Sequence, residues 1–385
     1  MRWPRFAARC LTDDRFSLSA ARPGTPPPFG APRESAADEP AITMKRSILA
    51  AVTASILVAL AGPVDAFAQR RPRTVTRPAN ETVIWRDPGA VGQLDLEGGA
   101  GGRSGAPLAP FQFEEEDSGG TNPKIKVTDA SGRRWGVKWG TEVNSEVFAT
   151  RIVWAAGYFV EPAYFVARGR IDGIPSGGLD RARKFVAADG SFNDARFELR
   201  EENVEKLKDE QSWAWNSNPF VGTKHLNGLK IAVMLVSNWD SKDRRDAGRG
   251  SNTGIYKYTL PSGTMETRYL FTDWGGSMGK WGNFFSREKW DCKGFASQSK
   301  DFIKGVKAGG IVEFGYSGQR TSDVAEGITA RDVRFVYKFL GQLSDEQLRD
   351  GLRACGATDE EMVCYVNAMR ERLNQMARVA ATVDK

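Results

Sequence analysis

Five polar side chains follow one another along the chain in an order that suits phosphoryl transfer. A Lys can hold phosphates, a Glu can orient that Lys, and an Asp can accept the proton of an acceptor group. An Asn and a second Asp can together hold a divalent metal ion. In chain order these residues are Lys138, Glu146, Asp240, Asn252 and Asp273.

Neighbouring residues compete for the same roles. Glu142 lies one helical turn before the Glu of the set and could replace it, and Asp243 could replace Asp240 as the base. Lys242 could neutralise a transferred phosphoryl group or lie exposed. The glycines directly behind Asp273 would let the backbone turn closely around phosphates.

The elements expected to position the first two residues are a hairpin and a helix. The runs 124–127 and 134–139 favour β-structure and are separated by the turn DASG. Thr141 is placed to cap a helix with apolar residues at helical spacing, which Gly157 ends. Further strands are expected in YFVEPAYFVARGRI and ARFELR. These segments predict a strand-rich small lobe over residues 116–202.

From residue 203 the pattern indicates helices and loops. VEKLKDEQSWAW is expected to be helix or loop, and LNGLKIAVMLVSN a helix buried all round. A charged loop, a β-rich segment and a PSG turn then lead to the strand before Asp273. The expected fold is α+β, with a helix-rich large lobe over 203–340 and a C-terminal helical extension over 341–385. Capping-box spacing predicts two helices there, starting at Ser344 and Thr358.

The N-terminal part has a different character. Residues 1–43 are Pro-rich without periodicity and are expected to be disordered or to precede the true start. Residues 44–68 carry two positive charges, an apolar run and a small-x-small ending, which is typical of a signal peptide. The apolar run is too short to span a membrane. Residues 69–115 are basic and Gly/Pro-rich and predict a flexible linker with at most one short strand. The mature protein is therefore expected to be exported, periplasmic or secreted, and not integral to the membrane.

Composition excludes several classes of function. Without residues 1–68 the chain keeps 46 Lys and Arg against 42 Asp and Glu, a scattered net charge of +4. This argues against a nucleic-acid surface, which would show a dense basic stripe. The single histidine, His225, excludes a His-rich zinc site, and its neighbours suggest a surface or capping role.

Three cysteines remain in the mature chain. They allow one disulfide and one free thiol, and the sequence does not fix the pairing. Cys355 with Cys364 closes a short loop and is the first choice, which would leave Cys292 free.

The segment VSNWDSKDRRDAGRGSNTGIYKYTLPSGTMETRYLFTDWGGSMGK resembles the catalytic core of the atypical kinases: spore-coat CotH kinases, HipA-type kinases and phosphatidylinositol kinases. GVKWGTEVNSEVFATRIVWAAGY is similar to their lysine strand and the helix after it. The resemblance covers about 124–282 and implies a two-lobed, protein-kinase-like fold. It implies that Lys138 contacts the phosphates of ATP or another nucleotide and pairs with Glu146. Asp240 would then be the base, and Asn252 and Asp273 would hold Mg²⁺ or Mn²⁺.

The sequence also departs from that pattern and leaves alternatives open. The stretch between Asp240 and Asn252 is long, so DRRDAGRG would have to be an insertion that loops out, and no clear GxGxxG motif is present. The partners would be a nucleotide and an unknown protein or small-molecule acceptor. The first alternative is a pseudokinase or a non-enzymatic envelope binding module, whose groove would be lined by tryptophans at 213, 215, 239, 274, 281 and 290. The second is a metal-dependent phosphoesterase with a metal cluster made by the aspartates at 240, 243, 246 and 273.

Overall fold

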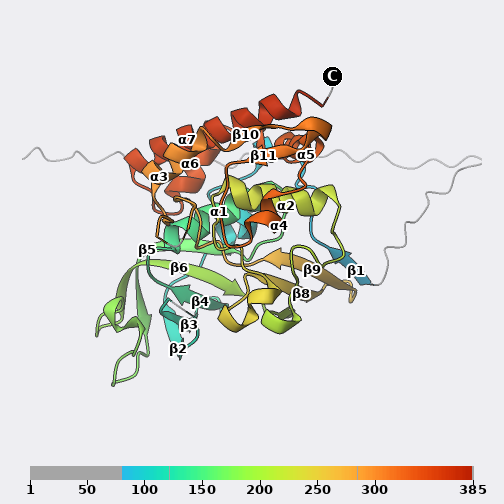
Figure 1. Ribbon diagram of the computed structural model, residues 1–385. Helices are drawn as coiled ribbons and strands as arrows, with labels where there is room; N and C mark the ends of the chain where they lie inside the picture. Colours follow the sequence, from blue (N-terminus) through green and yellow to red (C-terminus); the bar gives the residue numbers. More distant parts are fainter. Residues whose placement is uncertain (1–79, 121, 284, 384–385) are drawn as a thin grey trace, which may run out of the picture. The chain divides into compact units, whose positions relative to one another are not determined.

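The computed structural model of the chain describes residues 80–120, 122–283 and 285–383. The disordered start and the signal peptide that the sequence predicts lie outside these residues. The described chain is α+β, as predicted: it begins with a strand-rich part and ends in a series of helices (Figure 1). No described helix is long and apolar enough to cross a membrane.

Five strands close into a barrel in the order β2-β3-β4-β6-β5. Its interior is filled by apolar side chains that alternate along each strand, such as Ile125, Val127, Trp135 and Val137. The residues between them point away from this core. The strands are β2 (Phe111–Asp117), β3 (Lys124–Thr128), β4 (Arg134–Lys138), β5 (Ala163–Asp172) and β6 (Ser191–Arg200).

The register of the barrel places three cations in one row. Lys124 of β3 lies opposite Lys138 of β4, and Lys138 lies opposite Arg196 of β6. Residues opposite each other in adjacent strands share a face of the sheet. The predicted hairpin over β3 and β4 therefore delivers Lys138 together with two further positive charges.

A second sheet has the strand order β1-β9-β8-β7. β7 corrects the prediction of helix or loop for VEKLKDEQSWAW: its first four residues pair with β8, although they lack the alternation of apolar and polar residues that would indicate a strand. A separate hairpin follows later in the chain. The strands are β1 (Asn80–Val83), β7 (Val204–Leu207), β8 (Thr253–Thr259), β9 (Met265–Phe271), β10 (Ile303–Val306) and β11 (Val312–Phe314).

The structure corrects the linker predicted for 69–115 over the part that it describes. β1 pairs in parallel with β9, and β2 begins the barrel at Phe111. Between them Ile84, Val91 and Leu96 are buried in the main hydrophobic core. The Gly/Pro-rich composition gives turns and short 3₁₀ segments here, and these few apolar side chains are enough to fix the path of the chain.

Seven α-helices complete the described chain. α2 follows the expectation of a helix buried all round, since its apolar residues lie almost wholly in the main core. Figure 1 shows α6 and α7 beside α3 on one side of α1 and α2, with the barrel on the other. The helices are α1 (Val143–Ala155), α2 (Lys224–Leu235), α3 (Cys292–Ser299), α4 (Thr321–Ala325), α5 (Ala330–Leu340), α6 (Asp345–Arg353) and α7 (Asp359–Ala380).

Both predicted capping boxes are present, at the starts of α6 and α7. We expect Thr358→Ala to lower the free energy of unfolding by about 1 kcal/mol, because its hydroxyl satisfies the Glu361 N–H at the start of the 22-residue α7. Urea unfolding measures this change. Ser297→Ala, at an exposed residue of α3, is the control and should change the free energy by less than about 0.5 kcal/mol. Equal effects of the two substitutions would contradict a capping role.

The disulfide joins Cys292 to Cys364, with the Cα atoms 6.2 Å apart, and Cys355 is a buried free thiol. This corrects the pairing of Cys355 with Cys364. Cys355 lies just after α6, where its thiol donates to the Leu352 carbonyl, whereas Cys364 lies on the part of α7 that packs on α3. Proximity in sequence favoured the wrong pair because α6 and α7 turn these two side chains toward different neighbours.

Candidate active site

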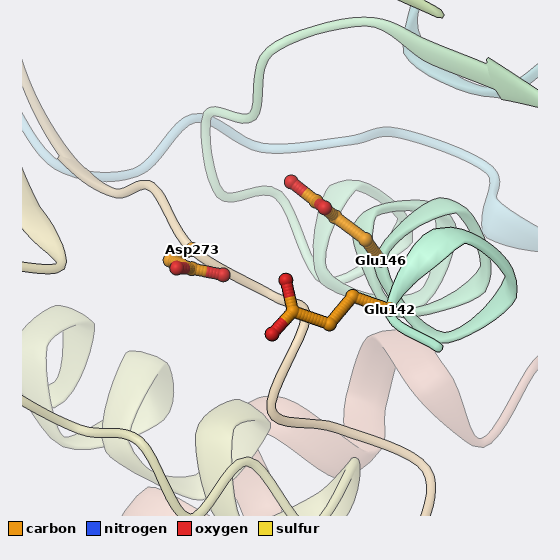
Figure 2. Close-up of side chains that lie close together, drawn as sticks. All are labelled: Glu142, Glu146 and Asp273. Atoms are coloured by element: carbon orange, nitrogen blue, oxygen red, sulfur yellow. The ribbon is translucent and has the colours of Figure 1, made fainter. Parts of the chain in front are cut away.

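Three carboxylates and one ammonium group meet where β4, the start of α1 and the end of β9 come together. Lys138 Nζ lies 2.7 Å from Glu142 Oε2 and 3.2 Å from Glu146 Oε2. Figure 2 shows the carboxylates of Glu142, Glu146 and Asp273 facing one another, and each offers one oxygen within 4.8 Å of the others. The structure thus brings Lys138, Glu146 and Asp273 together, and Glu142 joins Glu146 rather than replacing it.

A tight turn explains how close residues in the sequence can meet in this way. α1 begins five residues after Lys138, and the turn between them uses Gly140 with φ of 114°, a conformation that glycine adopts readily. Glu142 and Glu146 then lie one helical turn apart on the same face. Acidic groups in the first turn also interact favourably with the helix dipole. The closeness of the strand and the helix in sequence is therefore what places both carboxylates on Lys138.

The glycines behind Asp273 serve side chains of the site itself. A Cβ at Gly275 would come within 2.8 Å of the Glu142 carboxyl group, and one at Gly276 within 3.0 Å of the Asp240 Cβ. Gly275 N also donates to Asp273 Oδ1 at 2.9 Å, and Ser145 Oγ donates to the Gly275 carbonyl. The turn after β9 therefore lets α1 and the Asp240 loop approach Asp273 closely.

Arg196, on the neighbouring strand β6, is the fifth charged group of this cluster. Its Nη1 lies 2.6 Å from Glu146 Oε1 and also binds Glu198. Arg200, further along the same strand, leans over Gly136, where a Cβ would come within 2.6 Å of its guanidinium group. Neither arginine was predicted as part of the site, because the pairing of β4 with β6 joins residues that are about 60 positions apart in the chain.

Opposite charges set the ionisation of the buried groups. Burial alone would lower the pKa of Lys138, but Glu146, Asp273 and Glu142 outweigh burial and raise it above its ordinary value. Burial likewise opposes ionisation of Asp273, yet Lys138 and the Gly275 N–H lower its pKa below the ordinary value. Burial raises the pKa of Glu146, and Arg196 and Lys138 only partly offset this. Lys138 and Asp273 are therefore held in their charged forms.

Asp240, on the loop after α2, lines the same cavity as Lys138 and Asp273. Its Oδ1 accepts from Gln319 Nε2, and its Oδ2 lies 3.4 Å from Lys242 Nζ. Burial raises its pKa above the ordinary value, Asp273 adds to this, and Lys242 opposes it. A carboxylate that is positioned by neighbours and has a raised pKa suits proton acceptance.

Asn252 is placed behind Asp240 rather than among the described residues that line the cavity. Its Nδ2 donates to the Asp240 carbonyl, and its own carbonyl accepts from Thr272 N at 2.8 Å. Asn252 therefore ties the Asp240 loop to the strand end that carries Asp273. Of the Asn252 side chain, only the amide oxygen Oδ1 would remain to bind a metal ion.

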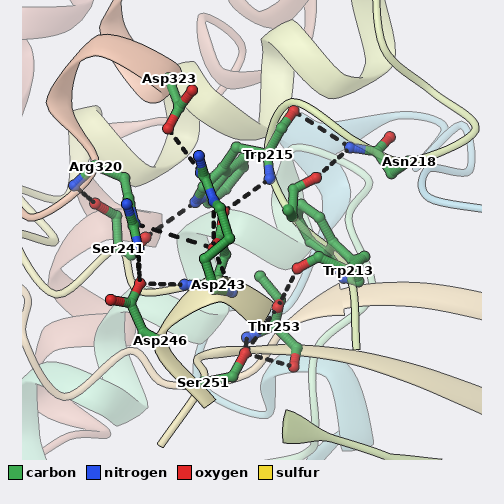
Figure 3. Close-up of polar contacts among 12 residues, drawn as sticks. Trp213, Trp215, Asn218, Ser241, Asp243, Asp246, Ser251, Thr253, Arg320 and Asp323 are labelled. Atoms are coloured by element: carbon green, nitrogen blue, oxygen red, sulfur yellow. Dashed lines mark hydrogen bonds and ion pairs between the residues drawn. The ribbon is translucent and has the colours of Figure 1, made fainter. Parts of the chain in front are cut away.

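A network of ion pairs fixes the loop between Asp240 and Asn252 (Figure 3). Asp243 is fully buried; it accepts from Trp215 N at 3.0 Å and pairs with Arg245 Nη2 at 2.6 Å. These contacts engage the Asp243 carboxylate away from the cavity. Asp243 therefore holds the loop and is not a candidate base.

The segment DRRDAGRG does not loop out, in contrast to the expectation. It forms a short 3₁₀ helix over Arg244–Arg249 with a capping box at its start. Asp246 pairs with Arg320 Nη2 at 2.8 Å, and Arg245 with Asp323 of α4 at 2.7 Å. The extra residues thus attach the loop to the segment that supplies Gln319.

These contacts remove the support for two alternatives. Asp243 and Asp246 face arginines, so the acidic cluster of a phosphoesterase does not form as predicted; among the described residues Asp273 groups with glutamates instead. The tryptophans at 213, 215, 274 and 281 are buried in the core, and Trp290 packs on Tyr365; Trp239 is mostly buried and is the one tryptophan of the six that lines the cavity of the candidate site. The other five stabilise the core and do not line an exposed groove.

The cavity around these groups measures about 520 Å³, within the range typical of small-molecule sites. The described residues that line it include eight Lys or Arg and five Asp or Glu. Lys208, Arg287 and Lys289 extend the positive charge beyond the row on the barrel, and Lys289 also binds Glu142. The cavity is therefore both acidic at its centre and cationic around it, as a metal-bound polyphosphate requires.

The donor set fits Mg²⁺ or Mn²⁺. Carboxylate oxygens are the ligands that these hard cations prefer, and the three carboxylates lie close enough to share one ion. Asp273 Oδ2 makes no hydrogen bond to any described residue and is open to bind it, with Glu142 and Glu146 beside it.

Sequence comparison does not identify a relative: no protein-family model and no curated protein matches the chain. Among solved structures, Golgi casein kinase with Mn/ADP bound overlaps 71% of this chain and 73% of its own, at 8% identity and a TM-score of 0.34. A second structure of Golgi casein kinase overlaps 73% of this chain and 73% of its own, at 8% identity and a TM-score of 0.35. The Rio2 kinase-ADP/Mg²⁺-phosphoaspartate complex from Chaetomium thermophilum overlaps 68% of this chain and 72% of its own, at 11% identity and a TM-score of 0.26. TM-scores this low carry no argument about activity, which has to be argued from the geometry of the site.

Proposed function

We propose that the protein is a kinase-like phosphotransferase that binds the phosphate chain of a nucleotide together with Mg²⁺ or Mn²⁺. The observation that carries this proposal is the meeting of Lys138 with three carboxylates in the cavity that also holds Asp240. Each of these groups has a role in phosphoryl transfer, and they come from four separate segments of the chain.

The roles follow from position and charge. Lys138, fixed by Glu142 and Glu146, lies where it can contact phosphate oxygens. A divalent ion at Asp273 would neutralise charge on the transferred group. Asp240 accepts the proton of an acceptor hydroxyl as that oxygen bonds to the terminal phosphorus, and the bond to the bridging oxygen breaks and leaves its electrons on the shortened chain. Lys242, next to Asp240, can offset charge on the transferred group.

A pseudokinase would use the same cavity only to bind. The distinguishing group is Asp240, since a protein that only binds has no need for a base held beside the metal site. We also propose that the protein is exported; the leader pattern over 44–68 supports this, as does the disulfide, because such bonds form in oxidising compartments.

Thermal unfolding with ATP and Mg²⁺ or Mn²⁺ tests the binding step. A ligand that binds only the folded state stabilises it by about 2.7 kcal/mol at one hundred times its Kd. We expect this stabilisation to require nucleotide and metal together, and to be lost in Asp273→Asn, which keeps the size of the side chain but removes its charge. Asp301→Asn, at an exposed acid outside the cavity, is the matched control and should keep the full shift. A well-folded protein with no shift in either metal would refute the proposed function.

A further inference from the structure

We infer that the site recognises its donor by the phosphate chain and not by the base, so that inorganic tripolyphosphate binds with the same affinity as a nucleoside triphosphate. This inference rests on the proposed function and narrows it to a class of donor. It follows from what the cavity offers to each part of a nucleotide.

The walls of the cavity offer nothing to a nucleobase. Base sites are lined mainly by apolar and aromatic side chains, with few polar groups. Here the described lining residues contain no aliphatic side chain and a single aromatic one, Trp239. The smaller cavity beside it, lined by Thr141, Trp239 and the segment 287–289, is equally polar.

The one aromatic ring is already covered. Arg287 lies over the Trp239 ring at 3.9 Å from its centroid, and Lys289 lies at 5.3 Å. The indole N–H donates to the Glu288 carbonyl at 3.0 Å, which fixes the ring against this segment. A base could stack on Trp239 only by displacing Arg287 from a favourable cation–π contact.

Residues that line the cavity also carry buried polar atoms without a partner. Arg196 and Thr272 line the cavity and are more than nine-tenths buried, yet Arg196 Nε and Thr272 Oγ1 have no partner among the described residues. Arg200 Nε is likewise a buried atom without a partner among the described residues. Buried polar atoms are rarely left unpaired, so a ligand with several oxygen acceptors is the expected partner.

Positive charge is also in excess of what the protein pairs. Lys208 lines the cavity, and within the described chain its ammonium group makes no ion pair or hydrogen bond. Together with the eight-to-five ratio of basic to acidic lining residues, this gives a site with a net charge of +3 that a polyanion neutralises. Charge-assisted bonds to phosphate are stronger than neutral ones and need no base.

A cavity of the described chain with more aliphatic and aromatic side chains in its lining lies elsewhere. It measures about 330 Å³, is lined by Leu94, Trp154, Phe159 and other residues, and shares none of them with the candidate site. Trp154 is eight residues further along α1 than Glu146, which is about 12 Å of helix. Buried side chains of α1 such as Val147 and Arg151 occupy the space along the helix between them. This second cavity is therefore not the base-binding part of the site.

Isothermal titration calorimetry of the full chain with Mg²⁺ present tests the inference. We expect ATP, GTP and tripolyphosphate to bind with Kd values within about threefold of one another, and adenosine to give no heat of binding. Lys208→Ala should weaken all three by the same factor, about tenfold, which is the loss of one charge-assisted contact. Lys307→Ala, at a lysine outside the cavity, is the matched control and should leave the three Kd values unchanged.

The outcomes separate this inference from the proposed function. If ATP binds more than tenfold tighter than GTP or than tripolyphosphate, the cavity recognises the base or the nucleoside and the inference fails, while metal-dependent nucleotide binding stands. If none of the three ligands binds in Mg²⁺ or Mn²⁺, the proposed function itself fails. If Lys208→Ala weakens ATP alone, the assignment of this lysine to the phosphate chain is wrong and the inference is overturned.

Discussion

Asp240→Asn is expected to lower the rate of phosphoryl transfer by about 10²- to 10⁴-fold and to leave the Kd of the metal–nucleotide complex unchanged. The substitution removes the proton acceptor and keeps the oxygen that accepts from Gln319. It also leaves untouched the Asp240 backbone carbonyl that Asn252 binds. Release of labelled phosphate from ATP, with water as the acceptor, measures the rate, and calorimetry measures binding. Equal losses in kcat and in affinity would contradict the role of a base.

The pH profile provides a second readout for the same variant. Proton acceptance requires ionised Asp240, and burial raises the pKa of this group. The rate should therefore fall on acidification at a higher pH than an ordinary aspartate would give. This acidic limb should be absent from the residual rate of Asp240→Asn. Asp243→Asn is the control: Asp243 contacts Trp215 and Arg245 but not the cavity, so its loss should lower stability and leave the acidic limb in place.

The residues predicted from the sequence are those that lie near turns between elements. Lys138 ends a strand, Glu146 follows within one helical turn of the start of α1, and Asp273 follows the end of β9. Short-range patterns of strand, turn and helix reveal such positions because they depend on neighbouring residues only. The order of these elements along the chain suggests that the side chains meet, and the structure places all three of them together.

The rest of the site depends on pairings that no local pattern contains. Arg196 reaches Glu146 because β6 lies beside β4 in a closed barrel, and Gln319 reaches Asp240 because the segment before α4 packs on the loop. Lys289 binds Glu142 from a position 147 residues away. The alternation of Arg196, Glu198 and Arg200 along β6 shows that these charges share one face of the strand, but without the partner strand this face cannot be assigned to the site.

Composition does not show whether a tryptophan binds a ligand or is buried in the core. The residue type alone allows the tryptophans to form either a ligand platform or part of the core, because aromatic side chains can serve either role. Trp213 donates to the carbonyls of Gly254 and Leu270, and Trp274 to that of Phe271, so their N–H groups are satisfied inside the core. Burial of this kind is a property of the assembled fold and is not visible in the residue type.

The C-terminal helices bear on the site through the segment that follows Asp273. Tyr365 of α7 donates to the Met278 carbonyl at 2.7 Å, and its ring packs on Trp290 with centroids 4.7 Å apart. Trp290 adjoins Lys289, which binds Glu142. α7 therefore braces the stretch of chain that carries Arg287 and Lys289 to the cavity, which gives the extension a physical connection to the site.

Removal of the disulfide is the change with the largest expected effect on stability. Cys292 and Cys364 are separated by 72 residues, and closing a loop of this length in the unfolded chain corresponds to about 4 kcal/mol in the chain-entropy treatment. We expect the double variant Cys292→Ala/Cys364→Ala to lose this amount in urea unfolding. The bond also joins α3 to α7 directly after the segment that carries Arg287 and Lys289.

A reductant distinguishes the disulfide from the packing of its two side chains. It should lower the stability of the unsubstituted protein by about the same 4 kcal/mol, because it opens the loop without changing the sequence. It should have no effect on the double variant, and its full effect on Cys355→Ala, since Cys355 is a buried thiol outside the bond. If Cys355→Ala abolished the response to reductant, the pairing of Cys355 suggested by the sequence would hold in solution. If the single variant Cys355→Ala loses the full amount of about 4 kcal/mol on reduction, the disulfide does not involve Cys355. Cys292 and Cys364 then close the loop that keeps α7 against the site.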